Sequence, residues 1–263
     1  MKEVLCTAWM DNGAETPVDA VWPGVALFAH LGFHLEYNEK VLEEEFKECV
    51  GGNLKDFMAL DAFDSLFLNG KANQEAQNPS KYLLYQDPLA GIFDQDVVMS
   101  GVDTGAYYEK LKEQMAACQE NSPEYAALFA YYEKLAAVLA DKADLGVRMK
   151  AAYDKKQLLA LKEICEKEIP ETIQNLEEMK VLREDLWMSE AKPFGYELMD
   201  VKLGAVITRL NSTIRRIKKY LDGSIPCLEE LEEMRLPYFE KNADKRENRW
   251  SQIISGSDLI DTI

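Results

Sequence analysis

The sequence is poor in the residues that build metal and disulfide sites. It contains only two histidines, His30 and His34, and five cysteines at wide, irregular spacing without a CxxC pair. Thiols in that arrangement are typical of a reducing compartment, so we expect reduced, mostly buried cysteines. A disulfide-knotted scaffold is therefore excluded.

Positive charge and long apolar runs are also scarce. Lys and Arg number 30 against 47 Asp and Glu, which gives a formal net charge of −17. Such a charge repels polyanions at long range, so we expect neither a nucleic-acid partner nor an acidic membrane surface. No stretch approaches the roughly 18 apolar residues of a membrane span, and residues 1–10 lack a signal-peptide core. We therefore expect a cytoplasmic protein with no membrane partner.

Helical periodicity dominates the chain from Thr104 onward, in a sequence whose 263 residues and 47% hydrophobic content suffice for a large core. Apolar residues recur every three or four positions, most clearly from Leu203 to Leu221, where Gly223 supplies a stop. Residues 154–187 read as one long element, kinked or restarted at Pro170. Short connections between these segments predict an antiparallel helical bundle, so the fold is mainly α.

The middle of the chain predicts shorter elements. Asn38 and Asn53 are suitable N-caps for two short helices, the first ending at Gly51. Residues 69–103 contain Gly, Asn, Pro and Asp throughout and follow neither helical nor strand periodicity. We expect this segment to be an ordered connector packed against the bundle.

The N-terminus has a different character, because a short apolar run ends in a turn-forming stretch. Residues 4–9 predict a buried strand, residues 11–17 a loop, and residues 18–31 a helix. A single parallel-type strand cannot cover both of its faces, so this β-loop-α unit implies missing partner strands. We expect the strand to pair with residues 250–255 or with a second copy of the chain, since an unpaired edge is prone to association.

The loop after this strand has the residue types of a sugar site. Trp9 offers an aromatic face for C–H groups, and Asp11 and Glu15 offer carboxylates that accept hydrogen bonds from hydroxyls. Strand ends are the usual ligand sites of α/β barrels. The competing interpretation makes Trp9 a core residue and Asp11 a turn or cap residue. Asp11 and Glu15 could also form the acid and base pair of a hydrolase.

Other motifs predict no metal or cofactor site. His30 and His34 have the spacing of two zinc ligands on a helix, but Gly32 lies between them and no HExxH pattern is present. We expect a solvated or hydrogen-bonded pair instead. A basic stretch at residues 209–219 either complements a helix dipole or binds a partner. No phosphate loop, GxGxxG, GxSxG or Ser/Cys–His constellation is present, so we expect no cofactor.

Several motifs together resemble one enzyme family. Residues 7–15 (TAWMDNGAE) resemble the last barrel strand and following loop of glycoside hydrolase family 20, the β-N-acetylhexosaminidases. Residues 78–87 (NPSKYLLYQD), 186–187 (LW) and 192–197 (KPFGYE) are similar to the helical C-terminal region of the intracellular-type subgroup. The similarity extends from about residue 3 to residue 254.

The resemblance implies an enzyme that removes terminal β-linked GlcNAc or GalNAc with retention, using the substrate's acetamido group as nucleophile. In the family an adjacent Asp-Glu pair, in a His-x-Gly-x-Asp-Glu motif several strands earlier, performs the chemistry. This sequence contains no such motif, so no catalytic residue is assigned. Trp9 would form a wall of the sugar pocket and Asp11 would bind ring hydroxyls, with Glu15 as a further substrate-binding candidate.

The resemblance thus predicts two parts. Residues 1–35 would be a remnant of the last strand and helix of a (β/α)8 barrel, and residues 36–263 a helical C-terminal domain, inactive alone. Its partners would be the remainder of the catalytic barrel and a glycan ending in N-acetylhexosamine, and a homodimer is compatible with the exposed strand edge. The alternatives are an independent helical carbohydrate-binding or protein-interaction module, and a complete hydrolase using Asp11 and Glu15.

Overall fold

The protein is mainly helical in the part of the chain that its computed structural model describes, which comprises residues 3–8, 15–34, 36–67 and 78–238. The regular elements of these residues are all helices and include no strand. In chain order they are η1 (Val18–Val21), α1 (Trp22–Phe33), α2 (Glu39–Val50), α3 (Leu54–Met58), η2 (Ala59–Phe63), α4 (Pro79–Tyr85), α5 (Asp94–Ser100), α6 (Thr104–Asn121), η3 (Pro123–Tyr125), α7 (Ala126–Lys142), α8 (Leu145–Asp154), α9 (Leu158–Glu163), the π-helical turn η4 (Ile164–Glu168), α10 (Ile169–Glu190), α11 (Tyr196–Leu221) and α12 (Glu229–Glu232).

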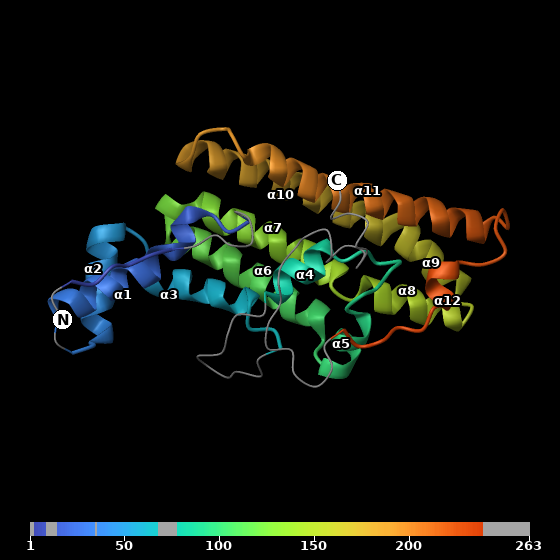
Figure 1. The fold of residues 1–263 in the computed structure, drawn as a ribbon, viewed down its shortest axis with the longest axis horizontal. Coiled ribbons are helices and arrows are strands. Elements are labelled where there is room, and N and C mark those ends of the chain that lie inside the picture. The colour runs from blue at the N-terminus through green and yellow to red at the C-terminus, as the bar shows by residue number, and fades with distance from the viewer. Residues whose placement is uncertain (1–2, 9–14, 35, 68–77, 239–263) are drawn as a thin grey trace.

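Four long helices form the body of the molecule. Helix α7 packs between α6 on one side and α10 on the other, and α10 pairs with α11. Figure 1 shows α10 and α11 lying side by side along the upper edge, with α1 and α2 at one end and α8, α9 and α12 at the other. The mainly α prediction is therefore confirmed, with the shorter elements α8, α9 and η4 lying between α7 and α10 in the chain.

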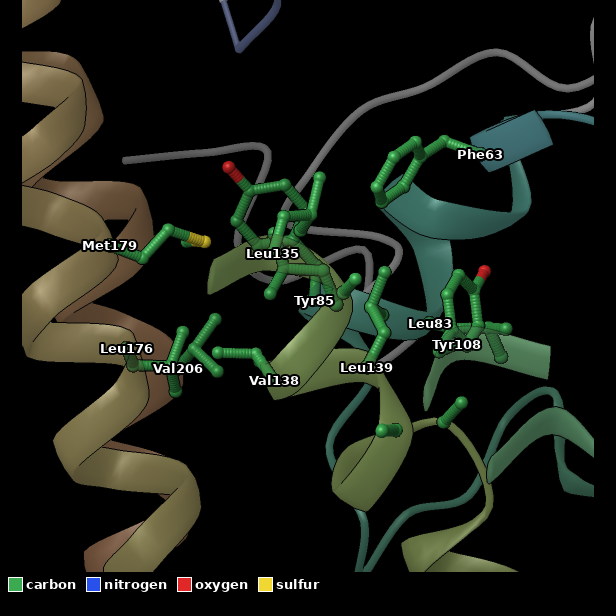
Figure 2. Packing of buried hydrophobic residues seen from close by; sticks show 14 of the residues in the cluster. Phe63, Leu83, Tyr85, Tyr108, Leu135, Val138, Leu139, Leu176, Met179 and Val206 are labelled. Atoms are coloured by element: carbon green, nitrogen blue, oxygen red, sulfur yellow. The ribbon is translucent and has the colours of Figure 1, made fainter. Parts of the chain in front are cut away.

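The core lies on both sides of α7 (Figure 2). Val138 points toward Leu176 of α10 and Val206 of α11, while Leu139 faces Leu83 of α4 on the opposite side. All five of these residues are at most 2% exposed. A helix that is buried on two faces needs apolar residues around most of its circumference, which explains the apolar composition of α7.

Local capping explains where the short helices begin. The Asn38 side chain accepts hydrogen bonds from the amides of Lys40 and Val41, and the Asn53 side chain accepts one from Lys55. Helix α2 ends at Gly51, whose φ of 88° is readily adopted only by glycine. Both predicted N-caps and the predicted glycine stop are confirmed.

The expected connector is more regular than its composition indicates. It contains α4 and α5, and every residue of α4 is buried. Hydrophobic periodicity does not reveal α4, because a helix that is buried on all sides has no exposed polar face to alternate with an apolar one. Residues 68–77, which belong to the same expected connector, lie outside the described residues.

The long element around Pro170 is continuous but not uniform. A π-helical turn, η4, joins α9 to α10 immediately before Pro170. Proline lacks an amide hydrogen and its ring displaces the preceding carbonyls, and a widened turn is one way to accommodate both effects. The predicted irregularity is therefore present as a π turn.

The expected N-terminal strand is not formed. Residues 3–8 adopt neither strand nor helix, and the side chains of Val4 and Leu5 are exposed rather than buried. Strands need a neighbour for their backbone groups, and no strand partner is present among the described residues. The loop that follows, residues 9–14, and the proposed pairing segment, residues 250–255, lie outside the described part of the chain. The helix predicted after the loop is present as η1 and α1.

Candidate functional site

One of the three predicted sugar-binding residues lies in the described part of the chain. Trp9 and Asp11 fall outside it, whereas Glu15 does not. Glu15 lies in a recess formed by side chains of α4, α7 and α11. We call this the Glu15 recess and define it by Glu15, Lys81, Tyr85, Tyr131 and Lys202.

Every polar atom of Glu15 beyond its amide has a partner in the recess. Its Oε1 accepts hydrogen bonds from Lys202 Nζ at 2.9 Å and from Tyr85 Oη at 3.1 Å, and its Oε2 lies 3.4 Å from Lys81 Nζ. Its backbone carbonyl accepts a hydrogen bond from Tyr131 Oη at 3.1 Å. The carboxylate side chain is only 16% exposed, so these contacts replace most of its hydration.

Burial dominates the electrostatics of the recess. It lowers the pKa of Lys81, and the nearby Lys202 lowers it further, while the Glu15 carboxylate opposes both effects. Burial also raises the pKa of Tyr85 and of Tyr131, so both phenols stay protonated and donate. Two lysines facing one carboxylate give the recess an excess of positive charge, which makes it a site for a carboxylate or another anion.

Further contacts hold the segment after Glu15 on the bundle. Pro17 is buried, and the amide of Val18 donates a hydrogen bond to Glu190 Oε2 of α10 at 3.1 Å. Trp22 Nε1 donates to Asp19 Oδ1 within the segment itself. Sequence analysis singled out Glu15 but not its partners, because Lys81 and Lys202 lie 66 and 187 residues away. No local pattern could have revealed them.

A second buried polar cluster joins α4, α5, α7 and α8. Lys142 Nζ donates hydrogen bonds to the carbonyls of Leu83 at 3.0 Å and Gln86 at 2.7 Å, at the C-terminal end of α4. Burial lowers the pKa of Lys142 to about 7, although Asp87 and Asp94 favour its charged form. Burial raises the pKa of Asp94 to about 7, opposed mainly by Arg235. The sequence contains no local sign of this cluster.

The basic stretch on α11 is largely used within the chain. Arg209 forms an ion pair with the buried Asp87, and Arg216 forms two hydrogen bonds with Glu230, at 2.9 and 2.8 Å. Arg215 donates to Ser212 on its own helix. These contacts favour the intramolecular interpretation of the basic stretch over a partner-binding one.

The two histidines lie together at the junction of α1 and α2. His30 Nδ1 and His34 Nε2 each lie 2.7 Å from a different oxygen of Glu45. Both histidines are therefore hydrogen-bonded, and Glu45 is the group that bridges them. The sequence did not identify Glu45, because α2 carries several glutamates with the same local pattern.

The five cysteines are all free thiols, as expected, but their burial is not uniform. Cys118 and Cys165 are buried, Cys227 is intermediate, and Cys6 and Cys49 are exposed. The expectation of mostly buried thiols is thus wrong for the N-terminal pair. Within the described residues, no helix combines the length and the apolar character that crossing a membrane requires.

Comparison with protein families places these features in a known group. The chain matches the family described as "Glycoside Hydrolase 20C C-terminal domain" over residues 55–250, which is more than half of its length. The match includes Lys81, Tyr85, Tyr131 and Lys202 of the recess, while Glu15 precedes it. No curated protein matched the chain. The chain belongs to the glycoside hydrolase 20C C-terminal domain family, which confirms the resemblance seen in its motifs.

Proposed function

We propose that this chain is the helical C-terminal domain of a β-N-acetylhexosaminidase and that it supports the catalytic barrel without hydrolysing glycans by itself. The parent enzyme would remove terminal β-linked GlcNAc or GalNAc by the substrate-assisted retaining mechanism. Family membership over residues 55–250 supports the domain assignment. The five free thiols support the cytoplasm as its location.

The inactivity of the isolated chain follows from the residues that it contains. The family's chemistry needs an adjacent Asp-Glu pair, and no Asp-Glu dipeptide occurs anywhere in the 263 residues. Asp11 and Glu15 do not replace that pair well, because both Glu15 oxygens already accept hydrogen bonds from buried donors.

The observation that carries the proposal is the apolar surface of α1. The helix is apolar around most of its circumference, and such helices are normally buried on all sides. In the described part of the chain, α2 and α3 pack against it, but much of its apolar surface remains exposed. The exposed apolar side chains of α1 are Val25, Leu27, Phe28, Leu31 and Phe33. We infer that this surface packs against the remainder of the barrel.

Residues 1–35 would belong to the barrel and residues 36–263 to the helical domain, and the loop residues would have separate roles. Trp9 and Asp11 would belong to the sugar pocket of the assembled enzyme. Glu15 would act behind the pocket, as the group that fixes the loop on the helical domain through the Glu15 recess. This assignment connects the recess to function, because a loop that carries ligand-binding residues needs a rigid attachment.

Reconstitution with the barrel tests the proposal. The chain is mixed with a separately produced chain that carries the preceding strands of a family 20 barrel, and hydrolysis of an aryl β-N-acetylglucosaminide is measured. We expect activity only in the mixture. Leu31→Glu should weaken association by at least tenfold, because it buries a charge in the apolar interface.

The matched control is Leu159→Glu on α9, at the opposite end of the molecule (Figure 1). Leu159 is also an exposed leucine on a helix, so the same substitution there should leave association unchanged. Failure of the two chains to associate, or equal effects of both substitutions, would contradict the proposed role of α1. Glycan binding by the chain alone, unaffected by the barrel, would favour an independent carbohydrate-binding module.

A further inference from the structure

Three metal-binding side chains meet where α1 packs against α2. His30 and His34 are four residues apart at the C-terminal end of α1, and Glu45 lies opposite them on α2. Their donor atoms all lie within 4.8 Å of one another. We propose that His30, His34 and Glu45 bind a divalent transition-metal ion such as Zn²⁺, which holds α1 on α2.

The fold positions each donor for this role. His34 is the C-cap of α1, its amide donates a hydrogen bond to the His30 carbonyl, and the two ring centroids lie 4.6 Å apart. Asn38 caps α2, the helix that carries Glu45. His30 is buried, whereas the side chains of His34 and Glu45 are 43% and 38% exposed. The cluster thus has a fixed interior ligand and an open side through which an ion can enter.

The donor set has the chemistry that zinc prefers. Two imidazole nitrogens and one carboxylate leave a fourth tetrahedral position for water. In a tetrahedral site with bonds of about 2.0 Å, ligand atoms lie about 3.3 Å apart. The Glu45 oxygen that binds the metal, now 2.7 Å from one of the two nitrogens, therefore has to move away from that nitrogen by roughly half an ångström.

The hydrogen bonds assign the ring tautomers before a metal binds. His30 Nε2 accepts a hydrogen bond from the Asn38 amide at 3.2 Å, so its proton lies on Nδ1, facing Glu45. His34 directs Nε2 toward Glu45, so its proton lies on that nitrogen. A metal that binds His30 Nδ1 and His34 Nε2 takes the place of the proton on each of these nitrogens, and each neutral ring keeps one proton on its other nitrogen. Binding therefore moves the proton of His30 to Nε2 and that of His34 to Nδ1, at the expense of the Asn38 hydrogen bond.

This pair of tautomer changes gives a direct test. The full chain, uniformly ¹⁵N-labelled, free of any affinity tag and with reduced thiols, is titrated with zinc chloride while long-range ¹H–¹⁵N spectra of the imidazoles are recorded. The chain has only two histidines, so each spectrum contains two rings. We expect both rings to change tautomer together and to reach completion at one equivalent of zinc.

Two variants distinguish specific zinc binding at this cluster from nonspecific binding elsewhere on the protein. Glu45→Gln should weaken the imidazole response by more than about 100-fold, since loss of even an outer-shell partner costs about 10- to 100-fold. Glu44→Gln, the neighbouring glutamate outside the cluster, should leave it unchanged. If Glu45→Gln alters the fold by circular dichroism, the exposed His34→Gln takes its place, with loss of the His30 response as the readout.

Two results would overturn the proposal. In the first, both rings keep their tautomers at equimolar zinc, whether or not the cysteines bind the ion. In the second, Glu45→Gln responds to zinc at the same concentrations as the unmodified chain. The outcome is independent of the proposed hexosaminidase role, because the measurement uses no substrate and no barrel.

Discussion

At the scale of single residues, we expect substitution of Glu15 to be strongly destabilising. Its carboxylate compensates two lysines that are 9% and 12% exposed in their side chains, so removing its charge leaves them close together without a counter-ion. Breaking a buried ion pair by removing one partner is far more costly than the pair is worth in total. The cost falls on the segment that Glu15 attaches, because the bundle has its own core.

The first prediction is that Glu15→Gln loosens residues 15–21 while the bundle stays folded. The expected loss is about 3 kcal/mol, or roughly 100-fold in amide protection. Hydrogen exchange at the Val18 and Ala20 amides measures it, since both are hydrogen-bonded in the attached segment. Glu113→Gln, an exposed glutamate of α6, is the control. Equal protection in the two variants would refute the attachment role.

The second prediction concerns Lys142, whose pKa burial lowers from 10.5 to about 7. At pH values between about 7 and 10.5, Lys142 is protonated in the unfolded chain and neutral in the folded chain. The contribution of Lys142 to the free energy of unfolding therefore rises with pH from about 7 toward 10. Lys142→Met should remove this rise, although it also lowers stability by leaving two carbonyls without a donor.

Urea unfolding of the chain and of Lys142→Met at several pH values between 7 and 9.5 measures the difference. The exposed Lys110→Met serves as a control for the loss of a positive charge. The account predicts that the gap between the chain and Lys142→Met widens as the pH increases. A gap that narrows or stays constant would mean that the buried lysine keeps its proton.

At the scale of elements, two helical glycines have opposite surroundings. A Cβ built on Gly146 of α8 would lie 2.5 Å from Asp94 Oδ2 and 2.6 Å from Asp94 Oδ1, whereas one built on Gly204 of α11 would meet nothing within 4 Å. Alanine stabilises a helix by up to about 1 kcal/mol over glycine where space allows. The close approach of α5 to α8 therefore depends on the absence of a side chain at position 146.

The third prediction follows from this contrast. Gly204→Ala should raise the free energy of unfolding by about 0.5 to 1 kcal/mol. Gly146→Ala should lower it by about 1 to 3 kcal/mol, because the methyl group displaces the buried Asp94 carboxylate. Chemical denaturation of the two variants in parallel tests both signs. A stabilising Gly146→Ala would show that α5 can move away without cost.

Some helices could be predicted from the sequence and others could not. Asn38, Asn53 and the seam from Leu203 to Leu221 identified their helices because capping and period are local properties. Helix α4 was missed because complete burial removes the polar half of the pattern. The strand at residues 4–9 was wrong over residues 4–8, since an apolar run encodes a strand only where a partner strand exists.

The candidate sites were less predictable than the elements. Sequence analysis selected Glu15 because an unusual loop is visible in a single segment, and it noted the four-residue spacing of His30 and His34 without predicting a site there. Lys81, Lys202 and Glu45 escaped, because each is one of many residues of its type and only the packing of distant helices brings it to its site.

At the scale of the whole molecule, we propose that the chain depends on a barrel for chemistry. It belongs to a glycoside hydrolase C-terminal domain family, contains no adjacent Asp-Glu pair, and exposes apolar side chains on α1. We propose that such a domain contributes a rigid attachment and an interface rather than reacting groups. The Glu15 recess would supply the attachment and α1 the interface.

The most direct measurement is the release of nitrophenol from an aryl β-N-acetylglucosaminide by the homogeneous chain, without any barrel. The account predicts no release above that of a buffer blank, and none that responds to Asp11→Asn. Sustained turnover that Asp11→Asn or Glu15→Gln abolishes would contradict it, and would mean that this chain is a complete hydrolase.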